Sequence, residues 1–382
     1  MKICLIYDFL TEIGGLEREM VNHARMLKEE GHDVEILTCH LDPEAVKKTG
    51  LGEIKIRVIS KIKSKYELIS LVSCFLGMNK LKYINPSAII SYSLPSNYLI
   101  RNKKVRRINF MNHFPHFLYL KEKEKAEWAS GTKGSKRQIA RVLSWFLGSW
   151  LRKIDKKYVK SAKINFSNSN FTKKRLDEIY NIESIASYPP LDPVFKPSKE
   201  KIKDRFVFSS SRIIPDKKYE WLISAVSLME NRIPLYISGQ GKEDYQRKLK
   251  ALGKAKRVKI KFLGRLSTED LIKSYSSAEV VAFSTPGEDF GLVPAESLAC
   301  GTPVVVWGDG AGPTEQVIHG VNGYHAKPYD LEDFAKKMDL AINSKIKTKN
   351  REKILNSAKR FSYNEVKKVF LGEINMVLSR SS

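Results

Sequence analysis

Apolar runs of strand length and amphipathic segments of helix length alternate along this chain from one end to the other. No other feature of the sequence restricts the fold as strongly. Short apolar runs without alternating polar residues are typical of strands that are buried on both faces. Amphipathic helices between such strands are typical of parallel sheets built from β-α-β units. The sequence therefore predicts an α/β protein.

The expected elements form two series, which the Pro-rich segment 187–193 separates. Strands are expected at 2–7, 33–38, 54–59, 87–91, 105–110, 163–167, 205–210, 234–238, 258–263, 280–283 and 303–306. Helices are expected at 16–30, 66–83, 136–161, 219–229, 245–252, 331–342 and 363–378. A Pro-rich break between two such series is typical of a linker. We place a first domain at 1–190, a second at 191–360, and a C-terminal helix within 361–382 that packs back on the first domain.

Two carboxylates stand eight residues apart in the second series. Glu288 lies in a loop after an expected strand, and Glu296 lies in the short apolar helix that follows. Open α/β folds bind ligands at the carboxyl edge of the sheet, so both side chains can face one pocket there. The E-x7-E spacing alone arises often by chance, whereas the whole block over 288–306 is far more specific.

Two cations, Arg212 and Lys217, follow the expected strand at 205–210. Cations at the end of a strand can converge on one diphosphate. Lys218 is a weaker candidate for this role, and solvation of the lysine pair is the alternative explanation.

Two further loops after strands carry candidate residues in the first series. Gly14 and Gly15 open a helix, where glycines let the backbone approach an anion closely; a tight turn without a ligand is the alternative. His113 stands two residues before Pro115. A histidine there can hydrogen-bond a sugar hydroxyl, although a lone histidine more often has a structural role.

These segments together resemble retaining glycosyltransferases of family 4, the type called glycosyl transferases group 1. The family commonly carries G-R-L-x-P-x-K-G where this chain has Ser211 and Lys218 in place of the two glycines. The resemblance implies the GT-B fold, in which two Rossmann-like domains with parallel sheets face each other across a cleft. It also implies that the first domain binds the acceptor and the second binds a nucleotide sugar.

The resemblance implies roles for the donor-binding residues. Glu296 would accept hydrogen bonds from the ribose, and Glu288 would contact the transferred sugar. The remaining donor contacts would come from Gly15, from main-chain groups near Leu266 at the nucleobase, and from the main chain of Phe290, Gly291 and Leu292.

The implied catalytic residues are His113, Glu288, Arg212 and Lys217. Arg212 and Lys217 would stabilise the charge on the leaving phosphate, and His113 would contact the donor sugar. The substrate would be a UDP- or GDP-linked hexose of the mannose or glucose type. No D-x-D motif stands at a strand end, so we expect a retaining hexosyltransferase that requires no metal and no other cofactor.

Positive charge is concentrated in the first half of the chain. The formal net charge is +25, and residues 51–190 hold 28 Lys and Arg against 9 Asp and Glu, a balance of +19. This imbalance favours an anionic partner such as a membrane surface or a phosphorylated lipid; a solvated lysine-rich surface is the alternative. Nucleic acid is not expected, because no recognisable nucleic-acid-binding module is present.

Aromatic residues flanked by Lys and Arg, as at Trp145, Phe146 and Trp150, suit the interface of a bilayer. We therefore expect a cytoplasmic enzyme, peripheral at the inner membrane face, that glycosylates a glycan or a polyprenyl or dolichyl diphosphate-linked saccharide. An amphipathic core helix is the alternative for this segment. Neither a signal peptide nor an apolar run of membrane-spanning length is visible, and the four cysteines, which lie in apolar runs, suit a reducing compartment.

Two rival classes remain open. One is another enzyme on the same fold, such as a nucleotide-sugar epimerase or a glycogen-phosphorylase-like enzyme. The other is a basic nucleic-acid-binding protein, which would leave the carboxylate block unexplained.

Overall fold

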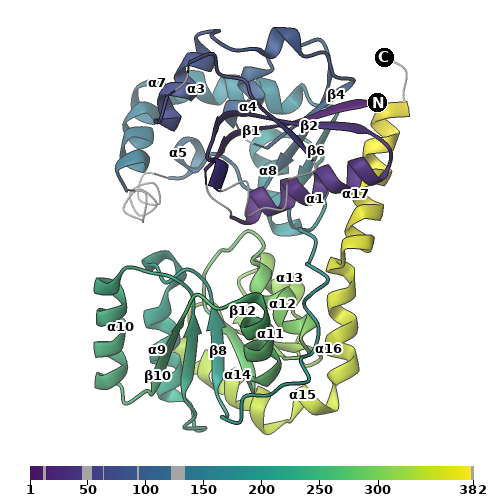
Figure 1. The fold of residues 1–382 in the computed structure, drawn as a ribbon. Helices are drawn as coiled ribbons and strands as arrows, with labels where there is room; N and C mark the ends of the chain where they lie inside the picture. The colour runs from purple at the N-terminus through teal and green to yellow at the C-terminus, as the bar shows by residue number, and fades with distance from the viewer. Residues whose placement is uncertain (12–13, 45–53, 63, 93, 122–133, 380–382) are drawn as a thin grey trace. The chain divides into compact units, whose positions relative to one another are not determined.

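The computed structural model describes residues 1–11, 14–44, 54–62, 64–92, 94–121 and 134–379, which form two compact units (Figure 1). Unit 1 consists of Met1–Pro190 and Val366–Ser382, and unit 2 consists of Leu191–Glu365. Each unit contains one sheet whose paired strands are all parallel. The predicted α/β class is therefore confirmed.

The sheet of unit 1 has the order β3-β2-β1-β4-β5-β6-β7. Its strands are β1 (Lys2–Leu10), β2 (Asp33–Leu41), β3 (Lys55–Val58), β4 (Ala88–Ser91), β5 (Arg106–Met111), β6 (Ile164–Ser167) and β7 (Ile185–Ala186). The helices of this unit are α1 (Gly15–Glu29), α3 (Glu67–Phe75), α4 (Leu94–Leu99), α5 (His116–Tyr119), α7 (Gly134–Lys160) and α8 (Asn170–Tyr180).

The sheet of unit 2 has the order β10-β9-β8-β11-β12-β13. Its strands are β8 (Val207–Ser210), β9 (Leu235–Ser238), β10 (Ile260–Gly264), β11 (Val280–Phe283), β12 (Val304–Trp307) and β13 (Gly323–Ala326). The helices are α9 (Tyr219–Leu228), α10 (Glu243–Ala255), α11 (Thr268–Ser277), α12 (Leu292–Ala299), α13 (Gly312–Gln316), α14 (Leu331–Asn343), α15 (Ile346–Lys349) and α16 (Arg351–Ala358).

Both faces of the unit 2 sheet are buried, which explains its continuous apolar strands. Along β8, Val207 joins the core cluster that includes residues of α9 and α14, whereas Phe208 joins the cluster that includes residues of α11 and α12. Val305 and Val306 of β12 divide between the two clusters in the same way. Successive strand residues point to opposite faces, so a strand covered on both sides needs apolar residues at every position.

The last helix, α17 (Tyr363–Ser379), packs into unit 1. Phe370 stacks on the buried His23 ring of α1, with ring centroids 4.1 Å apart and an interplanar angle of 11°. Its centroid also lies 5.5 Å from that of Phe166 in β6. The C-terminal residues therefore complete the core of the N-terminal unit.

One local prediction was wrong. The single helix expected at 66–83 ends at Phe75, because Gly77 adopts a φ of +83° and Asn79 Nδ2 donates to the carbonyl oxygen of Cys74. In the described part of the chain, none of the helices combines the length and the hydropathy required to cross a membrane.

Candidate active site

The strand order of unit 2 reverses at β8, which lies between β9 and β11. At such a switch point, the loops that follow the two neighbouring strands leave the sheet in opposite directions and open a crevice at its carboxyl edge. Here those loops are residues 211–218 after β8 and residues 284–291 after β11. They contain three of the four predicted catalytic residues, Arg212, Lys217 and Glu288.

An ion pair joins these two loops. Lys217 Nζ donates to Glu288 Oε2 at 2.6 Å, and the two side chains are only 15% and 27% exposed. Lys217 ends a short 3-10 turn, Pro215–Lys217, and Lys218 then adopts a left-handed φ of 52° before α9 begins. The structure thus brings together two residues that the sequence had placed in separate motifs.

The loop that carries Arg212 lies against a glycine turn after β9. A Cβ atom on Gly239, whose φ is +138°, would lie 1.8 Å from the carbonyl oxygen of Ser211. A Cβ atom on Gly241 would lie 2.2 Å from the carbonyl oxygen of Ile213. Arg212 itself is exposed between these contacts. The glycines at 239 and 241 therefore set the backbone path that presents Arg212.

Glu296 is held more deeply than Glu288. It lies on α12, is 7% exposed, and accepts a hydrogen bond of 2.8 Å from the Tyr275 hydroxyl of α11. Burial, together with the negative charge of Glu296 and this hydrogen bond, raises the pKa of Tyr275 well above its ordinary value. The two carboxylates thus have different partners, a lysine for Glu288 and a tyrosine for Glu296.

The main chain between the two carboxylates is fixed by the segment after β12. Gly312 N donates to the carbonyl oxygen of Glu288 at 2.9 Å, and Gln316 Nε2 donates to the carbonyl oxygens of Phe290 and Gly291 at 2.6 and 2.9 Å. A Cβ atom on Gly312 would lie 2.2 Å from the Asp289 carbonyl oxygen, so only glycine fits there. The sequence alone does not show this support, because it depends on a backbone approach between distant segments.

The same loop leads into the first turn of α12. Gly291 has a φ of +71° immediately before Leu292 begins the helix. The ring centroids of Phe290 and Phe361 lie 5.5 Å apart. The first amides of a helix have no acceptor within the helix, so they form a donor group for an anion or a hydroxyl. Phe290, Gly291 and Leu292 are therefore placed where main-chain binding is chemically reasonable.

Leu266 follows β10 at the same edge of the sheet. Its side chain is half-buried against the apolar cluster that includes residues of α11 and α12. Gly239 N donates to the carbonyl oxygen of Gly264 at 2.8 Å, so the turn after β10 is tied to the turn that supports the Arg212 loop.

Gly15 and His113 belong to unit 1. Gly15 starts α1, and a Cβ atom there would meet nothing within 4 Å, so the position does not require glycine for space. His113 is exposed just after β5, and its Nδ1 lies 3.2 Å from the carbonyl oxygen of Phe114. In the tautomer that donates this hydrogen bond, Nε2 is left as an acceptor.

A buried carboxyl group supports the loop that carries His113. Asn112 Nδ2 donates to Glu19 Oε2 of α1 at 2.7 Å, and Glu19 is only 2% exposed. Burial raises the pKa of Glu19 from 4.5 to about 8, against a smaller opposite effect of the Asn112 hydrogen bond. The sequence reading did not single out Glu19, because a Glu in an amphipathic helix is ordinarily solvated.

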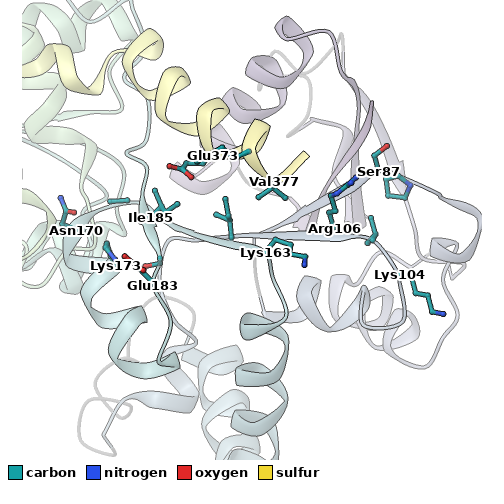
Figure 2. A pocket seen from close by; sticks show the side chains of 16 residues that line it. Ser87, Lys104, Arg106, Lys163, Asn170, Lys173, Glu183, Ile185, Glu373 and Val377 are labelled. Carbon is teal, nitrogen blue, oxygen red and sulfur yellow. The ribbon is translucent and has the colours of Figure 1, made fainter. Parts of the chain in front are cut away.

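A separate groove of about 1110 Å³ lies in unit 1, at the amino edge of the sheet and thus opposite its carboxyl edge (Figure 2). Ser87, Arg106 and Lys163 line it from the amino ends of β4, β5 and β6. Glu183 and Glu373 add negative charges, so its lining has mixed charge. Ligands in open parallel sheets bind at the carboxyl edge, so this groove is distinct from the candidate active site.

Comparison with known proteins matches both halves of the chain to families of one enzyme class. Residues 13–188 match "Glycosyltransferase Family 4", and residues 192–361 match "Glycosyl transferases group 1". An uncharacterized glycosyltransferase of Methanocaldococcus jannaschii is 34% identical over 163 residues, which are 42% of this chain and 40% of that protein. Alpha-1,3/1,6-mannosyltransferase alg-2 of Neurospora crassa is 25% identical over 400 residues, covering 87% of this chain and 80% of that protein.

Solved structures share the fold over the whole chain. Anabaena HepE in complex with UDP has a TM-score of 0.77 at 17% identity, covering 98% of this chain and 100% of that chain. Sucrose-phosphate synthase from Thermosynechococcus elongatus has a TM-score of 0.74 at 16% identity, covering 99% of each chain. The two family matches account for nearly all of the sequence between residues 13 and 361, and the strand order and the structural likeness agree with them. The chain spans less than half the length of the first curated relatives it matches, but the two family matches together show that it belongs to family 4 of the glycosyltransferases, the group 1 type with the GT-B fold.

Proposed function

We propose that this glycosyltransferase moves a hexose of the mannose or glucose type from a UDP- or GDP-linked donor to a polyprenyl or dolichyl diphosphate-linked saccharide, with retention of configuration. The observation that carries the proposal is the Lys217–Glu288 pair at the switch point of unit 2. The relatives support it: HepE has been solved with UDP-glucose, and alg-2 is a mannosyltransferase.

In this proposal unit 2 binds the donor. The positive charges of Arg212 and Lys217 attract the diphosphate, and Glu296 accepts hydrogen bonds from the ribose hydroxyls. Glu288 and the amides at the start of α12 contact the transferred sugar. No metal is part of the proposal, because the two cations supply the charge that the leaving diphosphate needs.

The proposed reaction takes place on one face of the sugar. The bond between the anomeric carbon and the diphosphate oxygen breaks, and a bond to the acceptor hydroxyl oxygen forms on the same side. The hydroxyl proton passes to the leaving phosphate, so no protein nucleophile is consumed. Arg212 and Lys217 stabilise the charge that develops on the leaving group. A contact of His113 with the donor sugar remains a prediction.

The acceptor side of the proposal concerns unit 1. Its excess of Lys and Arg over Asp and Glu favours a diphosphate-linked acceptor at an anionic membrane surface, and the enzyme is proposed to work at the cytoplasmic face. Glu19 and Asn112 fix the start of the loop that carries His113.

A panel of nucleotide sugars tests the donor assignment. Binding to the folded protein raises the melting temperature, so the true donor should stabilise the protein and its bare sugar should not. Anomeric analysis of the product by NMR then tests retention. Release of an epimerised nucleotide sugar would favour the epimerase alternative. If no nucleotide sugar stabilises the protein or is turned over, the proposal is wrong.

A further inference from the structure

Helix α3 of unit 1 leaves several large apolar side chains exposed. Its buried face holds Leu71 and Cys74 together with Ser70 and Ser73, which are 1% and 2% exposed. The Ser73 hydroxyl is satisfied internally, since its Oγ donates to the Ser70 carbonyl oxygen at 2.7 Å. Four large apolar residues lie on the outer side, where Leu68, Ile69, Val72 and the following Leu76 are exposed. A surface helix of a globular domain ordinarily turns its apolar stripe to the core, so the outer face of α3 suits an apolar environment.

Helix α7 also exposes large apolar side chains. Trp145 and Phe146 are 77% and 70% exposed, and their rings pack edge to face with centroids 4.5 Å apart. Val142 and Trp150 are exposed on the same face, because the spacing 142, 145, 146 and 150 follows the helical repeat. The small residues Ser144 and Gly148 point inward.

The two helices belong to the same side of unit 1 (Figure 1). Both pack against α4, where the Tyr98 ring lies edge-on to Phe75 of α3 and to Tyr158 of α7, with centroids 5.4 and 5.9 Å away. We call the exposed residues 68, 69, 72 and 76 of the α3 region and 142, 145, 146 and 150 of α7 the docking surface. Exposed apolar residues gathered on neighbouring helices mark an interaction site rather than a solvated surface.

Charge indicates which partner suits this surface. Among the described residues of α7, the only acid is Asp155, which is buried and accepts hydrogen bonds from the Tyr119 and Tyr180 hydroxyls at 2.8 and 2.6 Å. Exposed lysines follow the aromatic residues along the helix at positions 153, 156, 157 and 160. A second copy of a chain with a net charge of +25 would be repelled, whereas an anionic surface would be attracted.

We propose that unit 1 binds an anionic lipid bilayer through the docking surface. The aromatic and aliphatic side chains enter the boundary between headgroups and acyl chains, and the α7 lysines contact anionic headgroups. This proposal deepens and rests on the proposed function, because a polyprenyl-linked acceptor is carried in the same bilayer. Helix α7 also holds the segment after His113, since Arg152 Nη1 donates to the Leu118 carbonyl oxygen at 3.0 Å.

Vesicle flotation of the full chain tests the proposal. Phosphatidylcholine vesicles with about 30% phosphatidylglycerol should carry the protein, vesicles of phosphatidylcholine alone should carry much less, and high salt should weaken the binding. The triple variants W145Q/F146Q/W150Q and L68Q/V72Q/L76Q should each lose about tenfold or more in partition coefficient, because each removes apolar area that enters the lipid. A matched control, L228Q/I318Q/L340Q, removes three exposed apolar residues from unit 2 and should bind vesicles as the natural chain does.

Three outcomes would overturn the assignment: no flotation of the natural chain at low salt, equal flotation of the α7 variant, or equal loss in the control. Concentration-dependent dimers that W145Q/F146Q/W150Q abolishes, without vesicle binding, would assign the surface to self-association instead. Circular dichroism and melting temperature confirm that each variant is folded.

The experiment distinguishes failure of the docking surface from failure of the proposed function. Transfer to a short-chain, water-soluble acceptor should survive in W145Q/F146Q/W150Q. If no acceptor is glycosylated but flotation persists, the docking surface stands and the acceptor proposal fails.

Discussion

Lys217 and Glu288 form an ion pair of 2.6 Å across the crevice between the loops after β8 and β11. The pair places a lysine that is proposed to bind diphosphate in direct contact with a carboxylate that is proposed to bind the sugar. A bound diphosphate would compete with Glu288 for the Lys217 ammonium group, since both are anionic acceptors. Donor binding would then release Glu288 to accept a hydrogen bond from a sugar hydroxyl.

The two members of this pair should give different kinetic defects. Lys217→Met should weaken nucleotide-diphosphate binding by about tenfold or more, because it removes a charge-assisted hydrogen bond. Glu288→Gln should leave nucleotide affinity within about threefold of the natural chain while it lowers kcat, because its contact is with the transferred sugar. Titration calorimetry with the nucleotide and initial-rate kinetics measure the two effects. Lys218→Met is the matched control, and an unchanged affinity in Lys217→Met would remove the diphosphate role.

Substitution of Glu296 should lower the affinity for the nucleotide more than it lowers turnover. Glu296→Ala should weaken nucleotide binding, because the ribose loses its acceptor. Tyr275→Phe should cost about 1–3 kcal/mol of unfolding free energy, since it removes a hydrogen-bond donor from a buried carboxylate. Chemical denaturation and calorimetry separate the two effects. Equal activity and affinity in Glu288→Ala and Glu296→Ala relative to the natural chain would contradict the assignment of both carboxylates.

Gly312 should be intolerant of any side chain. Gly312→Ala would place a Cβ atom 2.2 Å from the Asp289 carbonyl oxygen and 2.5 Å from Phe290 Cα, so the loop between the carboxylates must shift. We expect a loss of about 1–3 kcal/mol in stability together with weaker donor binding. Gly372→Ala is the control, since a Cβ atom there would meet nothing within 4 Å. Tight donor binding by Gly312→Ala would show that the loop geometry does not matter for the site.

The buried Glu19 should make unfolding depend on pH. Burial raises its pKa from 4.5 to about 8, so the folded chain keeps a proton that the unfolded chain releases. The resulting stabilisation is fully present below 4.5 and is lost as the pH rises through 8. Between about pH 6.5 and about pH 8.5 the natural chain should therefore lose more stability than Glu19→Gln, which cannot ionise.

Melting temperatures of both proteins across that range measure the difference. Asp155 also has a raised pKa, of about 6, and remains in both proteins, so its contribution cancels. Parallel curves for the natural chain and Glu19→Gln would show that Glu19 is already ionised in the folded protein.

The sequence predicted the residues near the sheet edges better than the contacts between them. Arg212, Lys217 and Glu288 were identified because each follows an apolar run of strand length, and strand ends are where α/β folds bind ligands. The contact between Lys217 and Glu288 could not be predicted, since it depends on the sheet order that places β8 beside β11.

Two kinds of structural role leave almost no trace in a single sequence. Gly239 and Gly312 are required by carbonyl groups that approach from distant segments, and the sequence shows only that a glycine is present. The outer face of α3 was missed for a different reason. Apolar periodicity identifies a helix, but it does not show that Leu68, Ile69 and Val72 stay exposed while Leu71 and Cys74 are buried.

The crossing of α17 into unit 1 reverses the order in which the units can be completed during synthesis. Unit 2 is one continuous segment, so all its residues are available once the ribosome has passed Glu365. Unit 1 begins first but lacks Phe370, which stacks on His23, until the residues that follow unit 2 are made. Domains commonly fold as they emerge from the ribosome, with the N-terminal one first. In this chain the N-terminal unit must instead wait, with part of its core uncovered, until α17 has been made.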